Sequence, residues 1–143
     1  MNTSTPSVAL GAAVVVAALL AVVALFQVAL ACGAPWGAAA YSAGQWHPGD
    51  PVLPVHLRVV SATVQPVSYV LVALVILRRA GFSRVWAPLP DSWLPAAVWA
   101  LVGVWVASCV MNAITPSALE RAIWLPVVFV VLAATTTVAV TSR

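Results

Sequence analysis

Charged side chains are scarce in this sequence, and lysine is absent altogether. Only 6% of the 143 residues are charged, as 6 arginines and 3 acids. A soluble domain carries about 25% charged residues, so these side chains cannot cover the surface of a water-soluble globule. With 64% hydrophobic residues and a mean hydropathy of +1.09, the chain must have the bilayer as its main solvent. The polar remainder is too short for a separate soluble domain, so residues 1–143 form a single transmembrane domain.

Other absences exclude several kinds of site. The 2 cysteines are far apart and form no C-x-x-C pair, which excludes a thioredoxin-like motif or a four-ligand zinc site. His47 and His56 flank a proline-rich loop, so no histidine lies inside an apolar run where a haem would need it. The arginines are scattered, which argues against a nucleic-acid surface. We therefore expect no metal, no cofactor and no nucleic-acid partner.

Four apolar runs are long enough, or nearly so, to cross a bilayer: Val8–Ala31, Leu57–Leu77, Trp93–Met111 and Ile123–Val140. Lipid offers the backbone no hydrogen-bond partner, so each run should be a helix of about 20 residues. The sequence predicts an all-α fold, an integral membrane four-helix bundle with up-down-up-down topology.

The fourth helix should begin before its apolar run. Ser117 and Glu120 have the spacing of a capping box, which predicts a helix start near residue 118. Thr115 before Pro116 is a competing N-cap, with proline at the first helical position. The expected spans are therefore about 8–31, 57–77, 93–111 and 118–140.

The arginines predict the orientation in the membrane. The loop 78–92 carries three of the six arginines against one acid, Asp91, so the positive-inside rule places it in the cytoplasm. Arg143 then also lies inside, and both termini are cytoplasmic. The loops at 32–56 and 112–122 face outward. The expected location is the inner (plasma) membrane, with several crossings.

Residues 32–50 read CGAPWGAAAYSAGQWHPGD and directly follow the first apolar run. A lipoprotein cleavage site would carry its large aliphatic residue three positions before the cysteine, but Ala29 and Leu30 have the reverse order. The segment before the run also lacks the basic residues of a signal peptide. A retained first span followed by an ordered outer loop fits better. Trp36 and Trp46 would anchor this loop at the headgroup level, as a lid over the bundle.

Two further features of the spans leave alternatives open. Cys32 and Cys109 both fall near the predicted outer face, where a disulfide is permitted, although free thiols acting as small apolar residues are favoured. Small side chains recur at steps of four on the first span. Such a row allows close helix approach, within the bundle or to a second copy or partner membrane protein. The row consists of Ala9, Ala13, Ala17 and Ala21.

The second span carries a polar stripe. Arg58, Ser61, Gln65 and Ser68 are spaced three, four and three apart, which predicts one helix face. Pro66 should interrupt this helix. Other polar residues are expected at comparable outer depths, namely Gln27, Asn112, Glu120 and Arg121.

The stripe has two interpretations. In the structural one, the amides and serines bond between helices and Arg58 pairs with Glu120. In the functional one, they line an outward-open pocket for a small ligand or lipid headgroup, with Arg58 binding an anionic group above Gln65 and Asn112.

Three segments of the chain resemble an uncharacterised family of small four-helix bacterial integral membrane proteins. They are GAPWGAAAYSAGQW, LPVHLRVVSA and MNAITPSALERAIWLPV, in that order across most of the chain. The common form of the first motif has tryptophan-glycine where this chain has Tyr41-Ser42. The resemblance implies a four-span bacterial inner-membrane protein and implies no activity.

Three functions remain to be weighed. The favoured one is a non-enzymatic membrane protein, structural or accessory to a partner, surrounded by membrane lipids. The second is a binding protein or small transporter that uses the polar pocket, although no span has the mid-depth acid of a proton-coupled exporter. The third is an outer-face enzyme using Arg58, Glu120 and Asn112. A lone glutamate without a base, metal or nucleophile gives catalysis little support, so no catalytic residue is assigned.

Overall fold

The computed structural model describes residues 4–40 and 53–142, with side chains from residue 7 onward, and within these ranges it is all-helical. Four helical segments are long and apolar enough to cross a membrane, as the sequence predicts: Ser7–Ala31, Val55–Ala80, Asp91–Ile114 and Ala118–Thr141. The helices themselves are α1 (Ser4–Ala31), η1 (Gly37–Ala39), α2 (Val55–Ala62), α3 (Val64–Ala80), η2 (Asp91–Trp93), α4 (Leu94–Ile114) and α5 (Ala118–Thr141).

Local sequence explains where the helices end. Gly33 and Gly81 have φ of 96° and 112°, a left-handed conformation that glycine adopts without steric strain. Gly81 closes α3, where the next residue, Phe82, donates its N–H to the carbonyl of Leu77 at 3.2 Å. At the start of α5 the Ser117 side chain accepts the N–H of Glu120, so Ser117 is the N-cap that the capping-box spacing predicts.

The second span is broken at Thr63, which separates α2 from α3. Its backbone has φ −122° and ψ −72°, and its N–H is shared between the carbonyls of Val59 and Val60 at 3.1 and 3.4 Å. Pro66 lies in the first turn of α3, where it lacks the N–H that Ala62 would otherwise accept, and its ring crowds the preceding turn. The predicted interruption is therefore confirmed, and it lies one turn before the proline.

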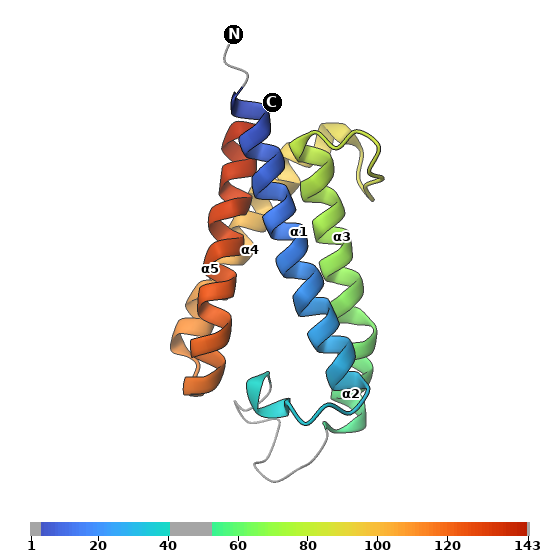
Figure 1. Cartoon of the computed structure of the whole chain (residues 1–143), viewed down its shortest axis with the longest axis vertical. Coiled ribbons are helices and arrows are strands. Elements are labelled where there is room, and N and C mark those ends of the chain that lie inside the picture. The colour runs from blue at the N-terminus through green and yellow to red at the C-terminus, as the bar shows by residue number, and fades with distance from the viewer. Residues whose placement is uncertain (1–3, 41–52, 143) are drawn as a thin grey trace.

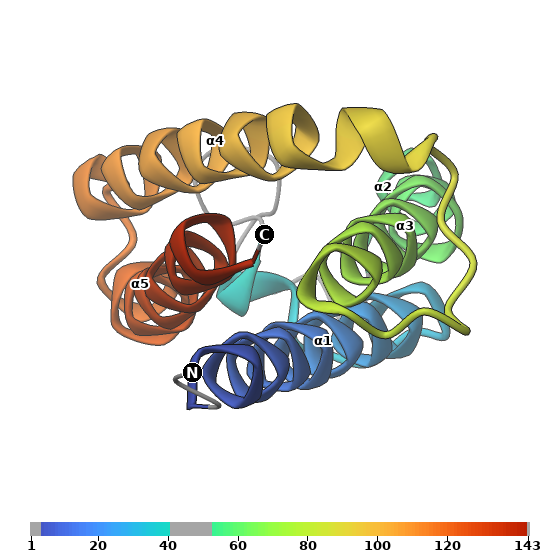
Figure 2. The ribbon, with the colours of Figure 1, turned by 90° about the horizontal axis from the view of Figure 1, so that it is seen from above.

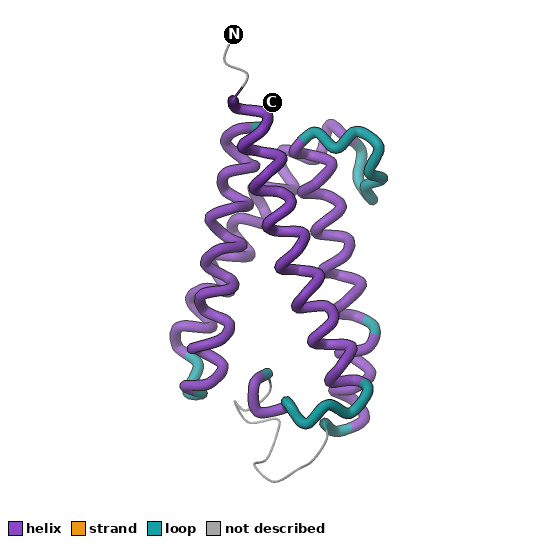
Figure 3. Tube along the Cα trace, in the orientation of Figure 1, coloured by secondary structure: helices purple, strands orange, loops and turns teal. Residues whose placement is uncertain are grey.

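The helices form two arms that meet at one end of the molecule. One arm consists of α1, α2 and α3, and the other consists of α4 and α5. α1 packs along α3 and against α5, and α4 packs along α5. Figure 2 shows α1 and α4 on opposite sides of the bundle. In Figure 1, α1 and α5 lie close together at the end that carries both termini, and they separate toward η1 and α2. Figure 3 shows the α3–α4 loop at the same end as the termini.

The main apolar core fills the end near the termini. It contains Ala9, Ala13, Val16 and Leu20 of α1, together with residues of α3, α4 and α5. Ala9 and Ala13 are buried within this chain, whereas Ala17 is partly buried and Ala21 is exposed. Each step of four residues turns a helix by 400°, which is 40° more than a full turn, so the alanine row moves gradually around α1. The buried residues of α1 stay on one face because their spacing alternates between four and three. Half of the row is thus used for packing inside the bundle.

Candidate binding cavity between the spans

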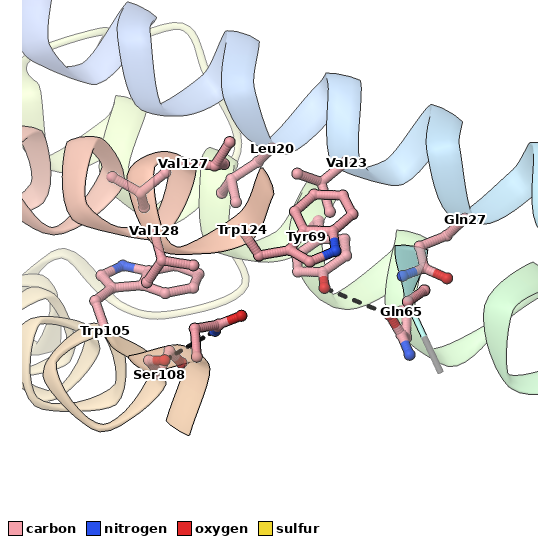
Figure 4. A pocket seen from close by; sticks show the side chains of 13 residues that line it. Leu20, Val23, Gln27, Gln65, Tyr69, Trp105, Ser108, Trp124, Val127 and Val128 are labelled. Carbon is pink, nitrogen blue, oxygen red and sulfur yellow. Dashed lines mark hydrogen bonds between the residues drawn. The ribbon is translucent and has the colours of Figure 1, made fainter. Parts of the chain in front are cut away.

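A cavity of about 240 Å³ lies where the two arms separate, and residues of all four spans line it (Figure 4). Its polar side chains are amides, hydroxyls and indoles. They come from Gln27 on α1, Gln65 and Tyr69 on α3, Trp105, Ser108 and Asn112 on α4, and Trp124 on α5. By contrast, a depression of about 270 Å³ between α3 and α4 is lined only by alanine, valine and leucine. Of these two cavities, only the one between all four spans offers hydrogen bonds to a ligand.

The cavity holds buried polar atoms that lack partners among the described residues. The Gln27 side chain is 6% exposed, and its Oε1 accepts no hydrogen bond. Trp105 is 9% exposed, and its Nε1 donates none. A buried polar group without a partner costs about 1–3 kcal/mol in proteins, so two such groups around one cavity call for an explanation.

Two hydrogen bonds in the cavity wall stay within single helices. The Tyr69 hydroxyl donates to Gln65 Oε1 at 3.4 Å, a long and therefore weak bond. Asn112 Nδ2 donates to the carbonyl of Ser108 at 2.8 Å. Neither bond joins one span to another, so neither explains the polar lining by helix association.

The segment 36–40, which we call the lid segment, is held against the bundle by aromatic side chains. Trp124 Nε1 donates to the carbonyl of Ala39. Phe26 stacks on Trp36 with ring centroids 5.9 Å apart, and meets Trp124 edge-on at 5.1 Å. Ala40 at the end of the segment lines the cavity. Trp36 therefore belongs to an ordered loop, as predicted, while Trp46 lies outside the described residues.

Arg58 lies elsewhere than predicted. Its Nε donates to the carbonyl of Ala31 at 2.9 Å, so it caps the C-terminus of α1, where a positive charge is favourable. It is not among the residues that line the cavity. The predicted ion pair with Glu120 is also wrong, because the ion pair found in the described ranges joins Arg78 to Asp91. The carbonyl of Ala31, the last residue of α1, accepts the guanidinium N–H instead.

Glu120 and Arg121 both bond around the start of α5. Glu120 is buried, at 7% exposure, and Thr115 Oγ1 donates to its Oε2 at 3.2 Å. Arg121 Nη1 donates to the carbonyl of Thr115 at 2.7 Å. Neither side chain lines the cavity, so Arg58, Glu120 and Asn112 do not converge there as an enzyme site would require.

The polar stripe is divided by the helix break. Ser61 is fully buried, whereas Ser68 is exposed and donates to the carbonyl of Val64 at 2.7 Å. Of the four predicted residues only Gln65 lines the cavity. The prediction of one continuous face is wrong because Ser61 precedes the break at Thr63 and Ser68 follows it. The two therefore do not share the register of one helix.

Cys32 and Cys109 are free thiols, Cys32 exposed and Cys109 partly buried. A disulfide between them is not formed, because α1 and α4 lie on opposite sides of the bundle (Figure 2). Of the two readings of the cysteines, the structure has the free thiols.

The sequence analysis missed the aromatic members of the cavity. Tyr69 lies four residues after Gln65, and Trp105, Ser108 and Asn112 are spaced three and four apart on α4. These are the helical spacings of a shared face, so they could have been grouped with the two glutamines. Trp124 had no such signal, because only the packing of α5 brings it to Ala39.

Among the described residues that line the cavity, none is charged and no nucleophile is paired with a base. These residues can bind an uncharged molecule through hydrogen bonds and aromatic surfaces. No family model, no curated protein and no solved structure matches the chain.

Proposed function

We propose that this chain is a non-enzymatic, accessory protein of the bacterial inner membrane that binds a small ligand in the cavity between its spans. The observation that carries the proposal is that Gln27, whose buried Oε1 lacks a partner among the described residues, lines a cavity of about 240 Å³. Ligand sites are about 300–1,000 Å³ for drug-sized molecules, so this one fits a smaller molecule or one end of a longer one.

The proposed topology is up-down-up-down, with both termini in the cytoplasm. In its support, the loop with three arginines lies at the same end of the molecule as both termini (Figure 1). The cavity and the lid segment then belong to the outer half of the membrane. When Cys32 and Cys109 are both replaced by serine, a thiol reagent applied from outside the cell should label Trp36→Cys and not Arg84→Cys. Labelling of position 84 would overturn the orientation.

The purely structural alternative is that the polar side chains only hold the spans together. The Asn112–Ser108 bond, which stays within one helix, weighs against it. Polar glue between membrane helices bonds from one helix to the next.

Filling the cavity distinguishes binding from packing. Val128→Phe on α5 places a ring in the cavity, and its matched control, Val130→Phe, changes a residue that is 44% exposed on the same helix. Val23→Phe on α1 is a second filling variant, with Val22→Phe as its control. Each protein is purified from bacterial membranes in mild detergent and weighed by native mass spectrometry.

The wild type and both controls should retain a bound small molecule, which both filling variants should lose. If the wild type carries no added mass, or if the filling variants retain it like their controls, the binding proposal is wrong. The structural, accessory reading would then stand alone.

A further inference from the structure

We infer that the cavity takes an uncharged, hydroxyl-bearing group, namely a polyol or the hydroxyl end of a neutral lipid. The inference rests on the proposed function and names the class of its ligand. Its starting point is the lining, in which every polar group of the described residues is neutral: amides, hydroxyls and indoles.

Three charged side chains near the ends of the spans bond outside the cavity. Arg58 bonds the end of α1, Arg121 bonds the carbonyl of Thr115, and Glu120 is held by Thr115 and its own helix start. An ionised ligand in this cavity would lose its hydration without gaining a counter-charge from the described lining, which is strongly unfavourable. The described lining therefore does not fit the anionic headgroup that the polar stripe suggested.

The two unpartnered atoms require complementary groups. Gln27 Oε1 needs a donor, and Trp105 Nε1 needs an acceptor. Hydroxyl groups supply both, since each has one O–H donor and two acceptor lone pairs. A hydroxyl also satisfies the Gln27 amide in either of its two orientations, which exchange its oxygen and nitrogen. In the amide orientation of this structure, a carbonyl-only ligand would leave Gln27 Oε1 without a partner.

The remainder of the wall suits the carbon skeleton of such a ligand. Trp105, Trp124 and Tyr69 present aromatic rings, and Leu20, Val23 and Val127 present aliphatic side chains (Figure 4). Aromatic surfaces beside a few polar groups are typical of sites for small, partly apolar molecules. Glycerol and the glycerol end of a diacylglycerol share this chemistry, and both are small enough for the cavity.

Four probes test the inference on the purified wild-type protein in detergent: glycerol, 1,2-dioctanoylglycerol, and their phosphorylated counterparts glycerol 3-phosphate and dioctanoyl phosphatidic acid. Binding is titrated by native mass spectrometry. At least one neutral probe should bind and compete with the co-purified mass, and its phosphorylated counterpart should not. Binding of glycerol identifies a free polyol as the source, and binding of dioctanoylglycerol alone identifies a lipid.

Two substitutions test whether Trp105 Nε1 and Gln27 Oε1 bind the ligand. Trp105→Phe removes the indole N–H and keeps an aromatic ring, and Gln27→Leu removes the amide. Each should weaken binding of the neutral probe by about tenfold, the usual effect of losing one hydrogen bond. Trp99→Phe is the control, because Trp99 lies on the same helix and is 52% exposed. A thermal melt of each variant shows that it remains folded.

Equal binding of a phosphorylated probe, or unchanged binding by both variants, would overturn the ligand class. The ligand class is also overturned if none of the four probes binds while the wild type carries a co-purified mass and Val128→Phe does not. That last result would leave the proposed function standing. If the wild type carries no co-purified mass, the proposed function itself fails.

Discussion

The two ends of this bundle differ in the surroundings of their polar side chains. At the end near the termini, α1, α3, α4 and α5 meet in an apolar core, and α5 threonines bond their own backbone: Thr136 to Leu132 and Thr137 to Ala133. At the other end the arms separate, and amides and indoles surround a cavity. We call the end with the apolar core the closed half and the end with the cavity the open half.

The closed half is also tied at its surface. Arg78 holds Asp91 through two bonds, Nε to Oδ1 at 3.0 Å and Nη2 to Oδ2 at 2.8 Å, which joins the end of α3 to η2. Arg79 donates to the carbonyl of Ser142 at 2.5 Å, which joins α3 to the end of α5. In the open half the corresponding ties are aromatic and involve the lid segment. The main apolar core and these arginine bonds thus lie in one half, and the cavity lies in the other.

The largest expected effect comes from equal truncations in the two halves. Val98→Ala in the closed core, where Val98 is fully buried, should lower the free energy of unfolding by about 2 kcal/mol, because it opens a new void among packed side chains. Val128→Ala in the cavity wall should lower it by less than about 1 kcal/mol, since space already lies beside it. Unfolding in a denaturing detergent titration measures both. Equal losses would contradict the distinction between the halves.

A smaller effect is expected at Arg58. Arg58→Gln should lower the free energy of unfolding by about 1 kcal/mol, because the end of α1 loses a hydrogen bond and a favourable charge. Glu120→Gln acts at a different helix end. In a double-mutant cycle the two substitutions should therefore be additive within about 0.5 kcal/mol. A coupling above about 1 kcal/mol would restore the ion pair that the structure does not contain.

The smallest effect concerns Thr135 in the closed half. Its side chain is fully buried, and its Oγ1 has no partner among the described residues. Thr135→Val keeps the shape and removes the unpaired hydroxyl, so it should raise the free energy of unfolding by about 0.5–1 kcal/mol. Thr136→Val is the matched control, because its hydroxyl donates to Leu132 at 2.8 Å and no gain is expected. A gain from the control alone would show that the unpaired hydroxyl is not the reason.

Part of the binding cavity was visible in the sequence. Gln27, Gln65 and Asn112 were all expected near the outer end of the bundle, because depth follows from position along a span. Arg58 and Ser68 were expected in the same group and do not belong to it. The position of Ser68 depends on the break at Thr63, and that of Arg58 depends on the carbonyl of Ala31 at the end of α1. Neither feature follows from spacing along a continuous helix.

The sequence by itself determined the number of spans, their ends and the break in the second one. Long apolar runs must be helical in lipid, and caps, glycines and proline act on the residues beside them. Tertiary structure decided which polar side chains meet. Lipid and protein interior are equally apolar, so the pattern along a helix does not say which face turns inward. Packing of the two arms made that choice, and it placed two glutamines and two indoles around one cavity.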